Sequence, residues 1–414
     1  MRNTVRKDAQ TIVTRSIAAV LPDAAVRRAL ENRTFSGRVV LVAAGKAAWQ
    51  MAKAAHDTLG ARIDAGVVVT KYDHVQGAIA NFDCYEAGHP VPDENSFRGT
   101  RAALELVENL TAEDTVLFLL SGGGSALFEQ PLVSGEELQD ITAQLLSSGA
   151  DIVEMNTIRK RLSAVKGGRF AQKCAPAKVV SVVLSDILGD PLDMIASGPA
   201  CADASTCAQA LEIARRYDLH LSETARKLLA EETPKEINNV ENQITGSVRE
   251  LCAAAADTCR ALGYEPVVLT DRLCCQAREA GSFLGSIARS HADSGENLAF
   301  LAGGETVVRL TGTGKGGRNQ ELALAAAEQI RGLDHVVVFS VGSDGTDGPT
   351  DAAGGMTDGA TAAALEAQGL SIHQVLADND AYHALQKTDG LIITGPTGTN
   401  VNDVAVVLIR GKQD

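Results

Sequence analysis

Short aliphatic runs, each followed by glycine or by helix-forming sequence, constrain the fold of this chain more than any other feature. In the first half the runs are RVVLVA (38–43), GVVVT (66–70), DTVLFLL (114–120) and KVVSVVLS (178–185). Strands that are apolar along their whole length fit a sheet buried on both faces. Strands that alternate with helices predict a parallel, doubly wound sheet. We therefore expect an α/β fold whose N-terminal domain is Rossmann-like.

The second half also reads as α/β, with a different sheet. EPVVLT (265–270), HVVVFSVG (335–342), LIITG (391–395) and VAVVLI (404–409) are strand candidates. NLAFLA and ETVVRL flank Gly303-Gly304, which predicts a hairpin and so at least one antiparallel pair. The weakly patterned stretch 232–247 places a boundary near residue 235. The expected domains are 1–235 and a smaller, mixed α/β domain at 236–414.

The charge balance excludes several classes of partner. The chain carries 38 basic and 52 acidic residues, a net charge of −14, which disfavours nucleic acid and anionic lipid. No apolar run approaches the ~18 residues that a membrane span needs, and the eight cysteines lack zinc-site spacing. We expect a cytoplasmic monomer or homodimer that binds small molecules.

Two glycine-containing turns follow predicted strands of the first domain. AAGKAAWQM (43–51) is a degenerate dinucleotide fingerprint, but Lys71 stands where a ribose-binding acid belongs. Lys46 at this turn is either solvated or a cation for a bound anion. LLSGGGSALFEQP (119–131) places Ser121, Gly122, Gly123, Gly124 and Ser125 at the carboxyl end of a strand, the binding edge of an open α/β sheet. We expect these five residues to bind nucleotide phosphates.

A basic segment and two acidic segments complete the polar candidates. Residues 153–171 carry Arg159, Lys160, Arg161, Lys166 and Arg169 around Gly167-Gly168, and a helix ending at Lys166 would aim one or two cations at a polyphosphate. The acidic segments are LSDILGDPLDMIASGP (184–199), with Asp186, Asp190 and Asp193, and VGSDGTDGPTDAAGG (341–355), with Asp344, Asp347 and Asp351. Such oxygen ligands suit Mg²⁺, although N-capping and turns use aspartate as well. TGPTGTNVND (394–403) is either a ligand loop or a polar hairpin.

The run TGTGKGGRNQE (311–321) is not a P-loop. If Gly314-Lys315 is aligned to the G-K of that motif, Gly316 replaces the magnesium-binding hydroxyl and Arg309 replaces the first glycine. Arg318, at the start of the next helix, is the functional candidate here, and Lys315 is its solvated neighbour. Glycine loops, aspartates and isolated cations together favour phosphoryl transfer, with His89 as either a general base or a structural residue.

The six segments LSGGGSALFEQP, NTIRKRLSAVKGGRFA, LSDILGDPLDMIASGP, GGETVVRLTGTGKGGRNQE, SVGSDGTDGPTDAAGG and TGPTGTNVND, in this order, resemble the MOFRL-type glycerate 2-kinases. Members are often labelled hydroxypyruvate reductases. The resemblance spans residues ~5 to ~408 and implies an active site in the cleft between two α/β domains, where ATP and Mg²⁺ phosphorylate D-glycerate on O2. It implies catalytic roles for Lys46 and Arg318.

The remaining site predictions combine this resemblance with the residue patterns. Ser121–Ser125 would hold the nucleotide with Lys166 and Gly167. Asp186 would orient the 2-hydroxyl or bind Mg²⁺, and Asp190 and Asp344 are the metal candidates. The alternative function is an NAD(P)H-dependent hydroxypyruvate reductase, which would need Gly45 to bind the dinucleotide. A non-catalytic sensor of phosphorylated acids is a third reading.

Overall fold

The chain forms two α/β units, and a computed structural model describes residues 2–411. One unit, the middle unit, is Ala25–Thr245, and the other, the terminal unit, consists of residues 2–24 and 246–411. The boundary expected near residue 235 thus lies at Thr245, and the first 24 residues group with the C-terminal sequence.

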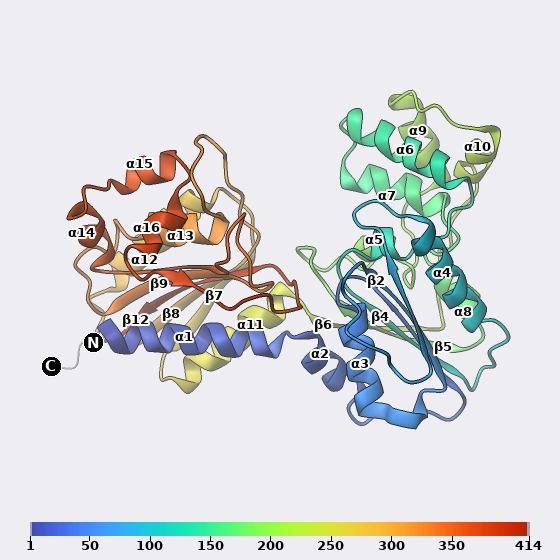
Figure 1. Cartoon of the computed structure of the whole chain (residues 1–414), viewed down its shortest axis with the longest axis horizontal. Helices are drawn as coiled ribbons and strands as arrows, with labels where there is room; N and C mark the ends of the chain where they lie inside the picture. Colours follow the sequence, from blue (N-terminus) through green and yellow to red (C-terminus); the bar gives the residue numbers. More distant parts are fainter. Residues whose placement is uncertain (1, 412–414) are drawn as a thin grey trace. The chain divides into compact units, whose positions relative to one another are not determined.

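The middle unit is built on a six-stranded sheet with the order β3-β2-β1-β4-β5-β6 (Figure 1). The strands are β1 (Val39–Ala44), β2 (Ala65–Lys71), β3 (Phe82–Ala87), β4 (Thr115–Leu120), β5 (Lys178–Leu184) and β6 (Val240–Gly246). Strands β1 to β5 are parallel, as the unbroken aliphatic runs predict. This is the strand order of the doubly wound dinucleotide-binding fold.

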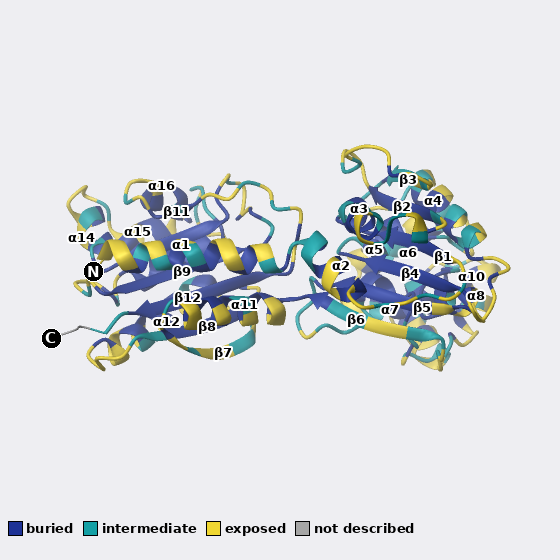
Figure 2. Ribbon diagram, turned by 90° about the horizontal axis from the view of Figure 1, so that it is seen from below, coloured by how far each residue is buried: buried dark blue, intermediate teal, exposed yellow. Residues whose placement is uncertain are grey.

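Alternate residues of these strands feed two separate cores. In β1, Val40 and Val42 pack with α4 and α8, whereas Leu41 and Ala43 pack with α2 and α3. Both sheet faces are therefore covered, and the strand interiors are buried in Figure 2. The helices are α2 (Pro22–Leu30), α3 (Ala48–Leu59), η1 (Gly60–Arg62), α4 (Glu94–Leu106), α5 (Gly124–Leu127), α8 (Arg169–Cys174) and η2 (Ile195–Ser197).

Four helices form a satellite cluster at one end of the middle unit (Figure 1). They are α6 (Gly135–Ser147), α7 (Ile152–Arg161), α9 (Cys207–Arg216) and α10 (Glu223–Leu229). Side-chain caps begin each of them, for example Asp151, which accepts a hydrogen bond from the amide of Glu154 at 2.8 Å. Helix α7 ends at Arg161, so the helix predicted to end at Lys166 is five residues shorter, and Lys166 lies in the following turn.

The terminal unit has a mixed sheet of order β11-β10-β9-β12-β8-β7. Its strands are β7 (Glu265–Leu273), β8 (Leu298–Gly304), β9 (Val336–Gly342), β10 (Gly354–Asp358), β11 (Leu391–Ile392) and β12 (Asp403–Ile409). Only β7 and β8 pair in parallel; the other neighbours are antiparallel.

Helices cover both faces of this sheet. Helices α12 and α13 pack on one face through Leu284 and Leu322, and α1 and α11 lie along the other (Figure 1). The helices are α1 (Arg2–Ala19), α11 (Val248–Ala261), α12 (Ala277–His291), α13 (Arg318–Ala326), α14 (Thr361–Glu366), α15 (Ile372–Ala377) and α16 (Ala381–Gln386). Among the described helices, none combines the length and apolar character that a bilayer span requires.

The hairpin predicted at Gly303-Gly304 is wrong. Strand β8 runs straight through both glycines and pairs with β12 and β7, neither of which is the adjoining segment 305–310. These glycines serve close packing instead of a turn: a Cβ on Gly303 would lie 2.3 Å from the Cys252 sulfur, and one on Gly304 would lie 2.2 Å from the Leu273 carbonyl oxygen.

Candidate active site

The strand order of the middle unit defines a switch point between β1 and β4. From this point the sheet continues through β2 and β3 on one side and through β5 on the other, and in such sheets ligands bind beyond the carboxyl ends of these two strands. The turn after β1 and the glycine loop after β4, residues 121–125, are joined by hydrogen bonds there. The Lys46 amide donates to the Gly122 carbonyl at 2.9 Å, and the Ala47 amide donates to Ser121 Oγ at 3.0 Å.

The glycine loop presents unused hydrogen-bond donors. Within residues 2–411, the amides of Gly122, Gly123, Gly124 and Ser125 have no hydrogen-bond acceptor. Gly123 has a φ of +86°, a left-handed conformation that glycine adopts without strain. Successive free amides in such a turn form a concavity suited to an anion. The prediction of a phosphate loop at 121–125 thus has a geometric basis.

Lys46 supplies a positive charge beside this loop. Its side chain is half-buried, and no carboxylate of residues 2–411 lies within ion-pair distance. Thr70 Oγ1 lies 3.3 Å and His74 Nδ1 lies 2.9 Å from the Lys46 carbonyl oxygen, so the lysine backbone is anchored. A Cβ built on Gly123 would lie 3.2 Å from Lys46 Cγ, so the lysine stem passes directly over the loop.

His89 packs over the same glycine. A Cβ on Gly123 would lie 3.0 Å from His89 Cδ2 and 3.1 Å from its Nε2. Burial lowers the pKa of His89, and the charges of Lys46 and Lys71 lower it further. The imidazole is therefore neutral at pH 7, the form that accepts a proton.

Two aspartates of the segment after β5, Asp186 and Asp190, have different surroundings. Asp186 Oδ2 would lie 2.2 Å from a Cβ on Gly122, so its carboxylate contacts the loop where only glycine fits. Asp190 has a φ of 54°, and its buried Oδ1 atom has no hydrogen-bond partner among residues 2–411. A buried carboxylate oxygen without a donor fits a cation ligand. Asp193 instead forms an ion pair with Lys160 at 3.4 Å.

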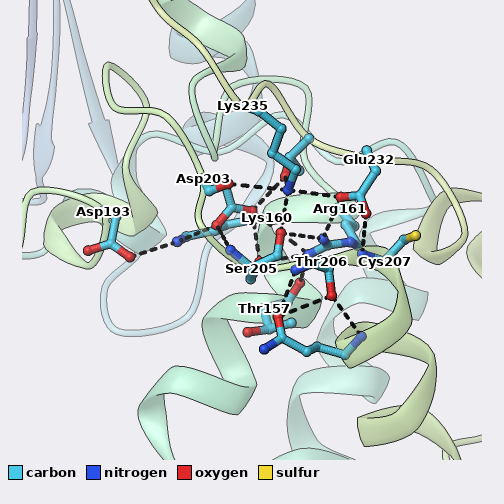
Figure 3. A network of polar contacts seen from close by, with 12 residues as sticks. Thr157, Lys160, Arg161, Asp193, Asp203, Ser205, Thr206, Cys207, Glu232 and Lys235 are labelled. Atoms are coloured by element: carbon cyan, nitrogen blue, oxygen red, sulfur yellow. Dashed lines mark hydrogen bonds and ion pairs between the residues drawn. The ribbon is translucent and has the colours of Figure 1, made fainter.

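The basic segment is largely an internal ion network (Figure 3). Lys160 pairs with Asp203 at 3.0 Å, and the fully buried Arg161 donates to Ser205 Oγ at 2.9 Å. Lys166 has no exposed side-chain surface and pairs with Glu129. Arg169 Nη1 donates to the Ser163 carbonyl at 2.7 Å.

Lys166 and Gly167, both predicted to bind nucleotide, have partners within the protein. Burial lowers the pKa of Lys166, and the charge of Glu129 opposes that shift. The Gly167 amide donates to the Ser197 carbonyl at 3.0 Å. Neither the Lys166 ammonium nor the Gly167 amide is therefore available to a ligand in this arrangement.

In the terminal unit, the amides of residues 311–315, the first part of the glycine-rich run, are engaged with residues 378–380. The amides of Thr311 and Gly312 both donate to Asn379 Oδ1, at 2.7 and 2.9 Å. The remaining bonds run from Thr313 to Asp378 Oδ1, from Gly314 to the Asp378 carbonyl, and from Lys315 to Asp380 Oδ1. Lys315 Nζ stacks 4.4 Å from the centre of the Tyr382 ring. The run is a docked loop, consistent with its failure to match a P-loop.

Arg318 begins α13 and is held by two carboxylates. Its Nε and Nη2 donate to Asp403 at 2.5 and 3.0 Å, and its Nη1 donates to Glu305 at 2.9 Å. Burial lowers the pKa of Arg318, but the hydrogen bond and charge of Asp403 outweigh it and raise that pKa. The Arg318 side chain is 33% exposed, and these three bonds use three of the five N–H donors of its guanidinium, which leaves two for an anion.

Asp347 and Asp344, the two candidates of segment 341–355, have different contacts. Asp347 accepts from the amides of Asn319 and Gln320 at 3.1 and 2.9 Å and so caps α13. Burial raises its pKa from an ordinary 3.8 to about 6. Asp344 Oδ1 accepts from the Thr346 amide at 3.0 Å and lies, like Asp403 Oδ1, 3.3 Å from the point where a Cβ on Gly342 would stand.

Sequence reasoning missed Asp403 and Glu305, the two residues that orient Arg318. Asp403 is the last residue of the TGPTGTNVND segment and the first of β12, so its position before a buried strand was a usable signal. Glu305 directly follows β8. The hairpin predicted at Gly303-Gly304 instead placed Glu305 at the start of a second strand. His74, whose ring contacts the Lys46 carbonyl oxygen, was also missed, and no sequence pattern marks it.

The sequence matches two families. Residues 8–230 match the family described as Domain of unknown function (DUF4147), and residues 298–403 match the MOFRL family. A D-glycerate 2-kinase of Thermotoga maritima is 54% identical over 98% of both chains. A relative from Agrobacterium vitis named as a hydroxypyruvate reductase is 38% identical over 95% of this chain and 92% of its own.

A solved structure has the same fold. The crystal structure of glycerate kinase from Thermotoga maritima superposes with a TM-score of 0.94 at 53% identity and covers 98% of this chain and 100% of its own. The chain belongs to the MOFRL-type glycerate 2-kinase family.

Proposed function

We propose that this protein is an ATP-dependent kinase that phosphorylates D-glycerate at O2, giving 2-phosphoglycerate and ADP. Membership of a family with a glycerate 2-kinase at 54% identity supports the activity over the reductase alternative. The observation that carries it is the row of four amides at the switch point, beside Lys46: within the described residues, 2–411, these amides have no acceptor and Lys46 has no ion pair. Amides that meet no protein acceptor are donors for phosphate oxygens.

The reaction asks mainly for positioning and charge stabilisation. The glycerate O2 attacks the γ-phosphorus, the bond from that phosphorus to the β–γ bridging oxygen breaks, and ADP leaves. In our proposal loop 121–125 holds the nucleotide phosphates and Lys46 stabilises the charge on the transferring group. Arg318 grips a carboxylate or phosphoryl group with its fork of donors.

The proton of the 2-hydroxyl needs an acceptor. Asp186 and the neutral His89 both border the loop, at Gly122 and Gly123. We assign orientation of the hydroxyl to Asp186 and proton acceptance to His89. A His89→Gln variant should therefore lose the acidic limb of the pH–kcat profile, because glutamine does not titrate.

Mg²⁺ fits the carboxylates of this chain. Among residues 2–411 no group of three or more histidine, cysteine, aspartate or glutamate side chains is placed to hold a metal. Mg²⁺ is commonly held by only one or two carboxylates, with phosphate oxygens and water as its other ligands. Asp190, with its partnerless Oδ1, would hold the ion that neutralises the phosphates, and Asp344 is the candidate in the terminal unit.

Product analysis by phosphorus NMR tests the proposal directly. Protein, ATP, Mg²⁺ and D-glycerate should yield 2-phosphoglycerate, which the spectrum distinguishes from 3-phosphoglycerate. Formation of the 3-isomer would overturn the O2 assignment alone. Rapid NADH loss with hydroxypyruvate and no coupling enzyme, without any phosphorylated product, would replace the kinase with a reductase.

A further inference from the structure

The basic segment 159–169 contains one cation that the ion network does not use. Of its five basic side chains, four have partners within residues 2–411: Lys160, Arg161, Lys166 and Arg169. Arg159 has neither an ion pair nor a hydrogen bond from its guanidinium within that range, although it is half-buried. Partly desolvated charges are ordinarily paired, so the missing partner calls for an explanation.

The position of Arg159 relates it to the glycine loop. One turn earlier on α7, Asn156 Oδ1 accepts from Ser197 Oγ at 2.8 Å, and Ser197 Oγ lies 3.3 Å from Ser125 Oγ of the loop. Residues three apart share a helix face, so Arg159 lies on the face of α7 that reaches the loop through Ser197.

The charges around Arg159 favour an anion from outside the chain. Burial lowers the pKa of Arg159, and the charge of Glu129 opposes this shift. Glu129 lies outside ion-pair distance of Arg159 and already neutralises Lys166. The surroundings thus contain two cations and one anion, which leaves one positive charge for a ligand.

We propose that Arg159 is a substrate-binding residue that donates to an anionic oxygen group, either the carboxylate of glycerate or a nucleotide phosphate. The proposal rests on the proposed kinase function and adds a second cation, besides Lys46, to the ligand site of the middle unit. The guanidinium fork suits both groups, since each offers two adjacent oxygens.

The test compares Arg159→Gln and Arg159→Lys with a matched control, Arg101→Gln, which removes an exposed arginine of α4. KM for ATP and for D-glycerate is measured separately, and calorimetry gives the Kd of each ligand alone with the full chain. Loss of a charge-assisted bond should raise KM and Kd for one of the two ligands roughly tenfold or more. Arg159→Lys should recover part of the loss, and Arg101→Gln should match the wild type.

The arms of the test identify the ligand. If KM and Kd rise only for ATP, Arg159 binds a nucleotide phosphate. If they rise only for D-glycerate, Arg159 binds the carboxylate. Values for both ligands within twofold of the wild type in Arg159→Gln would overturn the proposal, even if the melting temperature falls, because that pattern belongs to a structural partner of Glu129. If the wild type makes no 2-phosphoglycerate, the proposed function fails, and the calorimetric arm still decides whether Arg159 binds anions.

Discussion

The chain contains two glycine-rich loops that look alike in sequence and differ in what their amides do. Within residues 2–411, the amides of Gly122 to Ser125 have no acceptor, whereas the amides of residues 311–315 donate to side chains and carbonyls of 378–380. A lysine accompanies each loop: Lys46 forms no ion pair with any other described residue, and Lys315 lies against Tyr382. Glycine content alone therefore does not identify an anion site. What identifies it is whether the backbone amides of the loop already have acceptors within the protein.

The largest expected difference between the two loops comes from replacing the lysine of each loop with alanine. Lys46→Ala should lower kcat/KM roughly a thousandfold, the scale of losing a preorganised charge at the transition state. Lys315→Ala should leave turnover within about twofold, since it removes only a cation–π contact with Tyr382, worth about 1–2 kcal/mol at a half-buried site. Steady-state kinetics with thermal melts would show both, and near-normal turnover of Lys46→Ala would remove this lysine from the mechanism.

The second prediction concerns the arginine that follows the docked loop. Arg318→Lys should lower kcat/KM about a hundredfold, because lysine cannot reproduce the forked contact with Asp403 that orients the group. Arg309→Lys, at an exposed position just before the loop, is the matched control. Equal kinetics of the two variants would count against a role for the Arg318 fork.

Asp347 makes the stability of the terminal unit depend on pH. Because burial raises its pKa from 3.8 to about 6, the folded unit favours the protonated carboxyl. The resulting stability is complete below pH 3.8 and is lost as the pH rises through 6, a total change of about 3 kcal/mol, of which about 2 kcal/mol falls between pH 4.5 and 7. Urea denaturation of the wild type and Asp347→Asn at pH 4.5 and 7 measures it; parallel pH dependences would show that another group is responsible.

A glycine pair gives the smallest expected effects and sharpens the loop comparison. Gly122→Ala should displace the Asp186 carboxylate, which would lie 2.2 Å from the new Cβ, and lower kcat/KM about tenfold. Gly314→Ala places its Cβ 2.6 Å from the Asp378 carbonyl oxygen, so it should cost about 1–2 kcal/mol of stability with kcat unchanged. A loss of activity in Gly314→Ala together with normal kinetics in Gly122→Ala would contradict the roles assigned to the two loops.

The sheets were predictable because their signal is local. Each aliphatic run of the middle unit became a buried strand, and the loop at 121–125 follows from its place after β4. Long-range packing was not predictable: Gly303 and Gly304 resemble a hairpin turn but lie inside β8 against Cys252 and Leu273. The sequence suggested ligand cations in the basic segment, but ion pairs hold three of the five, Lys160, Arg161 and Lys166, and Arg169 donates to backbone carbonyls.

The first helix of the chain has a consequence for biogenesis. Helix α1 packs with α11, and Arg6 pairs with Asp358 at 2.7 Å while Arg410 pairs with Asp8 at 2.9 Å. Helix α1 is therefore synthesised before the middle unit, whereas its partners α11, Asp358 and Arg410 are synthesised after it. Apolar residues of α1 that are buried in the folded protein, such as Ile12, stay exposed to solvent until these partners have been synthesised. In a nascent chain, helix α1 should thus be a segment that chaperones bind, and removing α1 should destabilise the terminal unit.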